Sequence, residues 1–511
     1  MKQKAANPII WADVPDPDVI RVGEYYYMVS TTMHLTPGVP IMRSPDLINW
    51  ELISYVYDVL EDNDKYKLVA GENAYGRGSW AASIRYHKGI FYVCFASLDM
   101  NQTYIYHTED IEKGPWERSI LPGVYHDSSL FFHEDGRVYL VHGNGIIRIT
   151  ELNEEVTGIK QGGIDQILIH TVKKENRLNS EGSHFYKING TYYLFLIEWP
   201  DVGTKRRIEW CYRCDSLLGE YEGRVVLNDN FYYGNNGVAQ GGIIETPEGE
   251  WYALLFQDHG AVGRIPILVP VHWEEGWPMM GIDGKVPYEL PVTGKSPSYE
   301  LVVNDEFDYT KNHLKLSWQW NHNPDNRLWS VTKRPGYLRL TTGNVVPNIL
   351  SARNTLSQRT LGPVFTAETM LNTSGLKPGD YAGIAAYQSG YGLLGVKVAQ
   401  DGTRLVIAAD NDGHGFPMER AAVVLEQEEV YLKLQFVFNS GEIRNLTEVD
   451  RTYFSYSYDG RDWKTLDYAL TMKYTLDHFM GYRAALFCYA TIQPGGYADF
   501  DYFHYTTGQH L

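Results

Sequence analysis

The segment Gly190-Thr191-Tyr192-Tyr193-Leu194 decides the fold, because it joins a turn residue to the start of an apolar strand. The same phrase, a glycine followed two residues later by an aromatic or β-branched residue and then tyrosine, begins at five places: Gly23, Gly89, Gly136, Gly190 and Gly249. A glycine turn that leads into such residues is typical of a tight hairpin entering a β-strand. The five copies predict five repeats of one β unit.

The spacing of these glycines indicates the size of the repeat. Successive glycines lie 66, 47, 54 and 59 residues apart, which suits a four-stranded propeller blade better than a helical repeat. Strand-like runs fill the remaining sequence, and long amphipathic helical periodicity is absent. We therefore predict an all-β protein whose residues 1–298 form a five-bladed β-propeller.

The second part of the chain has a different pattern. After a stretch rich in Pro, Gly and Ser at 281–298, which we interpret as a linker, the fivefold phrase stops. Strand-like runs follow at 405–408, 430–438 and 451–458, with turn residues between them. About 210 residues of this kind predict a β-sandwich at 299–511.

Composition limits the classes of partner. The chain carries 45 Lys and Arg against 63 Asp and Glu, a net charge of −18, which argues against nucleic acid and anionic membranes as partners. Its 39 Tyr and 13 Trp suit stacking on sugar faces. The N-terminus leaves no room for the apolar region of a secretory signal, and no run of about 18 apolar residues occurs. We therefore expect a cytoplasmic protein.

Acidic residues recur at one position of the repeat. Counting back nine residues from the last four glycines, and seven from the first, gives Asp16, Trp80, Asp127, Glu181 and Gln240. In a blade these residues would open the innermost strand and face the central channel. Burying an unpaired charge there is costly, so three carboxylates in register indicate a chemical site. Pro17 is expected to hold Asp16 in extended backbone geometry.

Three acids at one channel mouth can protonate one oxygen and activate a water opposite it, which is the chemistry of glycoside hydrolysis. The sequence resembles glycoside hydrolase family 43 in the motifs that surround these acids. They are Asn7-Pro8, Asp16-Pro17-Asp18, Ser79-Trp80-Ala81, His126-Asp127-Ser128-Ser129-Leu130, Glu181-Gly182 and Gly263-Arg264. The resemblance implies a five-bladed propeller followed by a concanavalin-like sandwich of jelly-roll type.

The resemblance also implies roles for individual residues. Asp16 would be the general base, Glu181 the general acid and Asp127 the carboxylate that orients Glu181 and raises its pKa. Trp80 would form a wall of the sugar pocket and Arg264 would reach a ring hydroxyl, with His126 and Gln240 as further substrate contacts.

Two further expectations follow from the same resemblance. His259 matches a position that helps to hold a structural calcium in the channel, whereas the chemistry itself requires no cofactor. A sandwich loop is expected to close one side of the pocket, and Gly481-Tyr482-Arg483 is the stretch from which that contact would come.

The expected activity is exo-acting, inverting release of α-L-arabinofuranose from arabinoxylan or arabinan oligosaccharides, with β-xylosidase activity as a companion. His126, which replaces an expected hydrophobic residue, favours arabinofuranose. The alternatives are a β-D-xylosidase acting on xylo-oligosaccharides, a retaining fructan or sucrose hydrolase, and a carbohydrate-binding protein without turnover. The sequence leaves the oligomeric state open.

Overall fold

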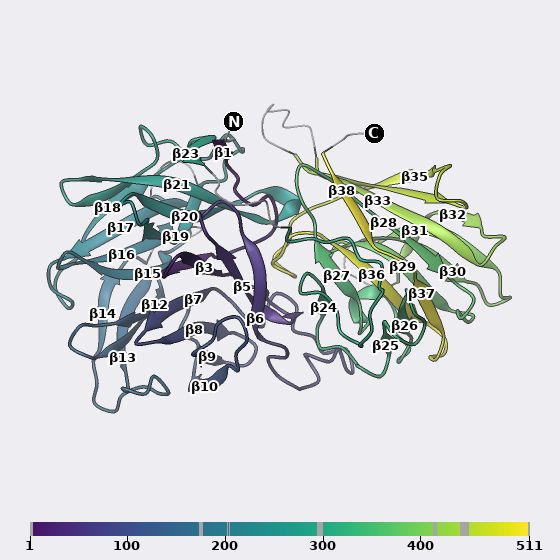
Figure 1. Cartoon of the computed structure of the whole chain (residues 1–511), viewed down its shortest axis with the longest axis horizontal. Helices are drawn as coiled ribbons and strands as arrows, with labels where there is room; N and C mark the ends of the chain where they lie inside the picture. Colours follow the sequence, from purple (N-terminus) through teal and green to yellow (C-terminus); the bar gives the residue numbers. More distant parts are fainter. Residues whose placement is uncertain are drawn as a thin grey trace.

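The computed structural model describes residues 4–172, 177–201, 203, 205–293, 300–411, 416–439 and 449–508 of the chain. Figure 1 shows two β-rich bodies side by side, the propeller in purple to teal and the sandwich in green to yellow. Helical structure in these residues is limited to two 3₁₀ turns, η1 (Gly260–Val262) and η2 (Ile349–Ser351). Within the same residues, no helix has the length and apolar character needed to cross a membrane. The predicted domain boundary at 298/299 lies outside the described residues.

Five four-stranded antiparallel sheets form the propeller, which confirms the predicted five blades. The first strands of the blades contact one another in a closed ring, β2–β7–β11–β15–β19–β2. The blades consist of β2 (Asp18–Val22), β3 (Tyr25–Val29), β5 (Gly38–Ser44) and β6 (Glu51–Tyr57); β7 (Ala82–His87), β8 (Ile90–Ser97), β9 (Gln102–Thr108) and β10 (Glu117–Pro122); β11 (Ser129–Phe132), β12 (Val138–Asn144), β13 (Ile146–Leu152) and β14 (Asp165–His170); β15 (Glu181–Ile188), β16 (Thr191–Glu198), β17 (Ile208–Cys214) and β18 (Glu222–Leu227); and β19 (Val238–Glu245), β20 (Trp251–Asp258), β21 (Arg264–Glu274) and β22 (Trp277–Met280).

The predicted glycine turns join the first two strands of every blade. Asn189-Gly190 is a two-residue loop between the paired residues Ile188 and Thr191. Both loop residues have positive φ, 51° and 90°, which matches the primed turn that suits the right-handed twist of the flanking strands. The second strand of each blade is then buried almost throughout, since neighbouring blades cover both of its faces. This burial explains the unbroken apolar runs after the glycines.

The N-terminus closes against the end of the propeller chain. Strand β1 (Lys4–Ala6) pairs with β23 (Glu289–Thr293). The side chain of Asn7 then donates to the carbonyl groups of Leu268 and Pro287, at 2.8 and 2.9 Å, and accepts from the backbone N–H of Leu268. These bonds fix the segment that leads into Asp16.

The C-terminal part forms the predicted β-sandwich, and each of its two sheets has eight strands in the described residues, β4 from the propeller half among them. One sheet has the order β32-β31-β30-β29-β36-β27-β24-β4, and the other has the order β25-β26-β37-β28-β33-β34-β35 with β38 also paired to β28. The strands are β24 (Gln319–Asn321), β25 (Trp329–Ser330), β26 (Leu338–Thr341), β27 (Leu356–Arg359), β28 (Val364–Asn372), β29 (Asp380–Tyr387), β30 (Gly392–Val398), β31 (Arg404–Asp410), β32 (Met418–Val424), β33 (Glu429–Val437), β34 (Arg451–Ser457), β35 (Lys464–Thr471), β36 (Arg483–Ala490), β37 (Tyr497–Phe500) and β38 (His504–Thr507).

The two domains are joined through shared structure. Strand β4 (Leu35–Thr36), which lies within blade 1 in the sequence, pairs with β24 and becomes the edge strand of a sandwich sheet. One cluster of buried apolar side chains also runs from blades 4 and 5 into the sandwich core. Continuous apolar burial of this kind favours a fixed relative position of the domains over the motion expected of a polar interface.

Three buried histidines meet an aromatic residue at this domain boundary. His34 comes from blade 1 and His322 and His478 from the sandwich, and their rings surround Tyr75 at centroid distances of 4.6, 4.6 and 4.0 Å. Burial lowers the pKa of His34 to about 3, with a smaller contribution from Arg483 in the same direction. Burial also lowers the pKa of His322 and His478 well below the ordinary value.

This cluster predicts that acidification destabilises the protein. An unfolded histidine takes up a proton below about pH 6.5, whereas folded His34 does so only near pH 3, so stability falls as pH decreases from 6.5. For His34 alone the loss by pH 5 is about 2 kcal/mol. Urea unfolding at pH 7 and pH 5 measures it, and His34→Gln should reduce the difference by about that amount. An unchanged pH dependence in His34→Gln would contradict the prediction.

Candidate active site

The five predicted positions all lie at the start of the innermost strands or directly before them, around one end of the channel. Asp16, Asp127 and Gln240 have left-handed backbones, with φ of 51°, 45° and 63°. Non-glycine residues are uncommon in this region, and its strain is often found at functional sites. The prediction of an extended Asp16 was wrong. Two backbone hydrogen bonds, from Val14 N–H to Arg264 O and from Thr31 N–H to Pro15 O, fix the chain just before Asp16. They hold Asp16 in the left-handed conformation although Pro17 favours an extended one.

Asp16 forms a buried ion pair with Arg264. Nη1 of Arg264 donates to both carboxylate oxygens of Asp16, at 2.9 and 2.8 Å, and the arginine side chain is only 2% exposed. Burial raises the pKa of Asp16, and the positive charge of Arg264 opposes that effect. The expected partner of Arg264 was a sugar hydroxyl; in this structure its partner is the candidate base.

His126, Asp127 and Glu181 form a compact group, in which one ligand atom of each lies within 4.8 Å of the others. Nε2 of His126 is 3.0 Å from Oε2 of Glu181 and 3.5 Å from Oδ2 of Asp127. Burial alone would lower the pKa of His126, but the two carboxylates outweigh it and raise that pKa to about 9. The pKa of Asp127 is raised by burial and by Glu181. Asp16 stands outside this group.

Asp127 is tied to the strand that carries Glu181. Its Oδ2 accepts a hydrogen bond from the backbone N–H of Gly182 at 3.1 Å, and its carbonyl accepts from Ser183 N–H at 3.2 Å. Gly182 has φ of 70°, and a Cβ there would lie 2.8 Å from Cγ of Gln240. Because Gly182 has no Cβ, the side chain of Gln240 packs directly against its backbone.

A second donor to Glu181 was missed by the sequence analysis. Nδ2 of Asn144 donates to Oε2 of Glu181 at 2.5 Å, and Oδ1 of Asn144 accepts from Asn179 at 2.9 Å. Asn144 stands in Gly143-Asn144-Gly145, which resembles an ordinary turn in the sequence. Arg207 was also missed; it is half-buried, forms an ion pair with Asp258, and has its pKa lowered by partial burial and by Arg264.

Aromatic rings from both domains line the site. The Trp80 ring lies 5.8 Å from His126 and 5.6 Å from Phe479, which belongs to the sandwich loop between β35 and β36. The guanidinium of Arg264 lies 4.4 Å from the centre of the Phe479 ring, and its Nη2 donates to the Phe479 carbonyl at 3.4 Å. Phe479 is thus a sandwich side chain that contacts the arginine partner of the candidate base.

The stretch Gly481-Tyr482-Arg483, in which that contact was expected, has other partners. The backbone N–H of Gly481 donates to Asp13 at 2.9 Å, and that of Tyr482 donates to Ala261 O at 2.8 Å. Arg483 binds Ser357 and Gln319 inside the sandwich. Gly481 and Tyr482 therefore attach the loop to the propeller and hold Phe479 in place.

His259 lies at the boundary of blade 5 and the sandwich. Its Nδ1 is 3.2 Å from Oε1 of Gln257 and its Nε2 is 3.1 Å from the carbonyl of Asn439. Burial lowers its pKa to about 4. Because both ring nitrogens face oxygen atoms of the chain, His259 fits calcium ligation poorly in this conformation, and the channel calcium stays a prediction.

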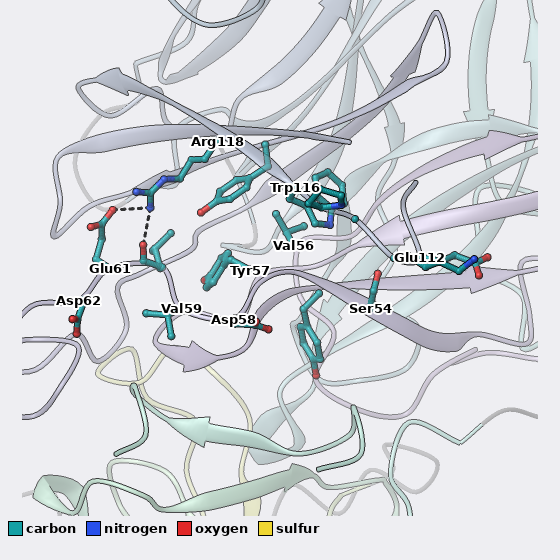
Figure 2. A pocket seen from close by; sticks show the side chains of 16 residues that line it. Ser54, Val56, Tyr57, Asp58, Val59, Glu61, Asp62, Glu112, Trp116 and Arg118 are labelled. Carbon is teal, nitrogen blue, oxygen red and sulfur yellow. Dashed lines mark hydrogen bonds and ion pairs between the residues drawn. The ribbon is translucent and has the colours of Figure 1, made fainter. Parts of the chain in front are cut away.

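A separate cavity of about 660 Å³ lies between the outer strands of blades 1 and 2. Figure 2 shows Tyr57 and Trp116 around it and Arg118 bonded to Glu61 at its edge. None of the three channel acids lines this cavity. Arg118 and Glu61 form an ion pair at its rim, and Glu112 and Asp62 pair with Arg43 and Lys67 outside it. The chemistry is therefore assigned to the channel mouth, where the three acids in register lie.

A five-bladed propeller whose channel mouth holds an arginine-paired carboxylate, a histidine-linked carboxylate group and aromatic walls suits a glycosidase. Residues 5–278 match the model of Glycosyl hydrolases family 43, and residues 304–506 match the β-xylosidase C-terminal concanavalin A-like domain. The chain therefore belongs to glycosyl hydrolases family 43.

Relatives with known names support this assignment. A β-xylosidase of Formosa agariphila is 30% identical over 98% of this chain and 90% of its own length. A non-reducing end α-L-arabinofuranosidase of Bacteroides ovatus is 31% identical over 65% of this chain and 64% of its own length. The solved structure of a bifunctional GH43-CE protein of Bacteroides eggerthii has a TM-score of 0.92 and 45% identity. It covers all of this chain, which spans 64% of that protein.

Proposed function

We propose that the protein is an exo-acting, inverting glycosidase that releases α-L-arabinofuranose from arabinoxylan or arabinan oligosaccharides and also hydrolyses β-D-xylosides. The observation that carries this proposal is the division of the carboxylates into two environments. Asp16 pairs with Arg264, whereas Glu181 and Asp127 share His126. Two carboxylates in different environments suit a base and an acid.

The arrangement supports the following roles. Arg264 opposes the effect of burial and favours the carboxylate form of Asp16, which can then take a proton from the attacking water. Glu181 donates its proton to the leaving oxygen, while His126 and Asn144 hold its Oε2. Asp127 positions Glu181 through the backbone N–H of Gly182. Inversion requires space for water between acid and base; Asp16 does not belong to the compact group of His126, Asp127 and Glu181, although burial and, to a smaller extent, the charge of Glu181 raise the pKa of Asp16.

The sandwich side chain at the site supports the proposal of exo action. Phe479 and Trp80 stand beside each other across the domain boundary, and an aromatic wall at the channel mouth favours binding of one terminal sugar. We infer no cofactor for the chemistry. Cytoplasmic location stays a prediction from the N-terminal sequence, and the lack of nucleic-acid or membrane partners stays a prediction from the net charge.

β-D-Xylosidase as the main activity is the second candidate. It is favoured by the relative from Formosa agariphila, which matches 98% of this chain and is named a β-xylosidase. Both substrates are pentosides, and one pocket that bonds hydroxyl groups can accept either.

Parallel assays with 4-nitrophenyl α-L-arabinofuranoside and 4-nitrophenyl β-D-xylopyranoside test the proposal. We expect turnover of both, with the higher kcat/KM on the arabinoside; the reverse order would support the second candidate. NMR of the first product formed should show the inverted anomer. A retained anomer, or no turnover of either sugar, would contradict the proposed mechanism or function.

A further inference from the structure

A second cavity lies at the domain boundary, between the propeller loop 58–81 and the sandwich. Its volume is about 670 Å³, which is within the range of small-molecule sites. Lys65, Asn73 and Arg77 line it from the propeller, and Ser351, Asp477 and His478 line it from the sandwich. None of the channel acids belongs to its lining.

The walls of this cavity are held by hydrogen bonds between the domains. The hydroxyl of Tyr75 bonds the Leu350 carbonyl at 2.6 Å and accepts from Nδ2 of Asn321 at 2.7 Å. The Tyr75 ring also stacks on His478, with centroids 4.0 Å apart and ring planes 4° from parallel. The cavity is therefore formed before any ligand binds, which lowers the entropic cost of binding.

Four charged side chains line the cavity without ion pairs to one another. Lys65, Glu72, Arg77 and Asp477 have neither an ion pair nor a side-chain hydrogen bond to any residue that the structure describes. The set holds two donors and two acceptors of strong hydrogen bonds. A sugar hydroxyl donates and accepts at once, so a mixed set suits a neutral sugar, whereas the two carboxylates would repel an anionic ligand.

Two short segments connect this cavity to the active site. Three residue steps separate Arg77 from Trp80, so their Cα atoms are at most about 11 Å apart. Two steps separate Asp477 from Phe479, at most about 7 Å. The segments also touch, since a Cβ on Gly76 would lie 2.5 Å from the Asp477 carbonyl. Each segment has one end beside the candidate catalytic residues and the other in the cavity.

We propose that this boundary cavity binds sugar units on the leaving side of the scissile bond, so that the enzyme prefers oligosaccharides to short glycosides. The inference rests on the proposed glycosidase function. Arg77 and Asp477 are the residues expected to contact the hydroxyl groups. A hydrogen bond to a charged group is typically strong enough for an effect of about tenfold on affinity.

Kinetics on long and short substrates test the proposal. Arg77→Ala and Asp477→Ala should each raise KM about tenfold for xylotetraose and for an arabinosylated xylotriose. Their kcat/KM on 4-nitrophenyl pentosides should stay at the wild-type value, because these substrates lack a leaving-side sugar. The matched control is Arg461→Ala, which removes the same charge from the exposed turn between β34 and β35 and should change neither value.

Three outcomes would overturn the proposal: unchanged oligosaccharide kinetics in both variants, equal losses on long and short substrates, or inhibition of oligosaccharide hydrolysis by inorganic phosphate that Arg77→Ala abolishes. The last result would assign the cavity to an anion. Failure of the wild type on nitrophenyl pentosides would instead contradict the proposed function, so the two failures are distinguishable.

Discussion

Asp16→Asn is expected to lower kcat by about 10³-fold on both nitrophenyl pentosides, because the amide cannot take a proton from the attacking water. The amide has nearly the same shape as the carboxylate, so the loss should appear in kcat rather than in KM. Stopped assays of arabinose or xylose release at several substrate concentrations separate the two constants.

The same substitution is also expected to destabilise the fold. It leaves the buried guanidinium of Arg264 without its counter-charge, and breaking a buried pair on one side costs about 3–5 kcal/mol. Thermal unfolding of Asp16→Asn should be measured first, and activity assayed well below its melting temperature. Binding of the free pentose to the folded variant then shows that the pocket is intact.

Neighbouring acids provide the control for this assignment. Asp13 accepts from the backbone N–H groups of Arg264 and Gly481, at 2.7 and 2.9 Å. Asp18 pairs with Arg85 and His184, which outweigh burial and lower its pKa to about 2. Neither carboxylate is available as a base, so Asp13→Asn should retain far more activity than Asp16→Asn. Substantial activity in Asp16→Asn, with loss in Asp13→Asn, would move the base to Asp13.

A small anion offers an independent test of the role of Asp16. Added azide needs no general base, and in Asp16→Asn it should restore turnover of the nitrophenyl glycoside and yield a glycosyl azide of inverted configuration. A structural defect would not respond to azide. Absence of rescue in a variant that still binds pentose would argue against Asp16 as the base.

Local sequence signals were sufficient to predict the fold. The glycine of each turn determines a hairpin, and aromatic and β-branched residues after it determine a strand, so five copies predict five blades. The acids were predictable for the same reason, since Asp127 and Glu181 occupy equivalent places in successive repeats. The family resemblance then supplied their roles as expectations.

Features that depend on contacts between distant segments were not predictable in this way. Strand β4 looks like part of blade 1, and only its pairing with Trp320 and Asn321 places it in the sandwich. Phe479 belongs to a loop without a distinctive motif. The backbone of Asp16 is determined by its neighbours' bonds and by Arg264, which lies 248 residues away, and these override the local effect of Pro17.

Glu181→Gln is expected to lower kcat most on substrates whose leaving group must be protonated in order to depart. On arabinosylated xylo-oligosaccharides, whose leaving alkoxide is strongly basic, kcat should fall about 10³-fold, because protonation of the departing oxygen is lost. On 4-nitrophenyl arabinofuranoside, whose phenolate leaves without a proton, the loss should be much smaller. A series of aryl glycosides with increasing leaving-group pKa therefore should show a steeper dependence in Glu181→Gln than in the wild type.

The pH profile separates an acid from a residue that only binds the sugar. With a general acid in place, kcat on the oligosaccharide should fall at alkaline pH as that acid loses its proton, and Glu181→Gln should remove this limb. Asn144→Ala is the matched comparison, because Asn144 contacts the same Oε2 atom but transfers no proton. The pH profile of Asn144→Ala should therefore keep its alkaline limb, at a shifted pH. If Glu181→Gln lost the same factor in kcat on activated and unactivated substrates, and the alkaline limb of its pH profile were unchanged, Glu181 would not be the general acid. Asp127, whose pKa burial raises and which hydrogen-bonds Gly182, would then be the carboxyl group to test next.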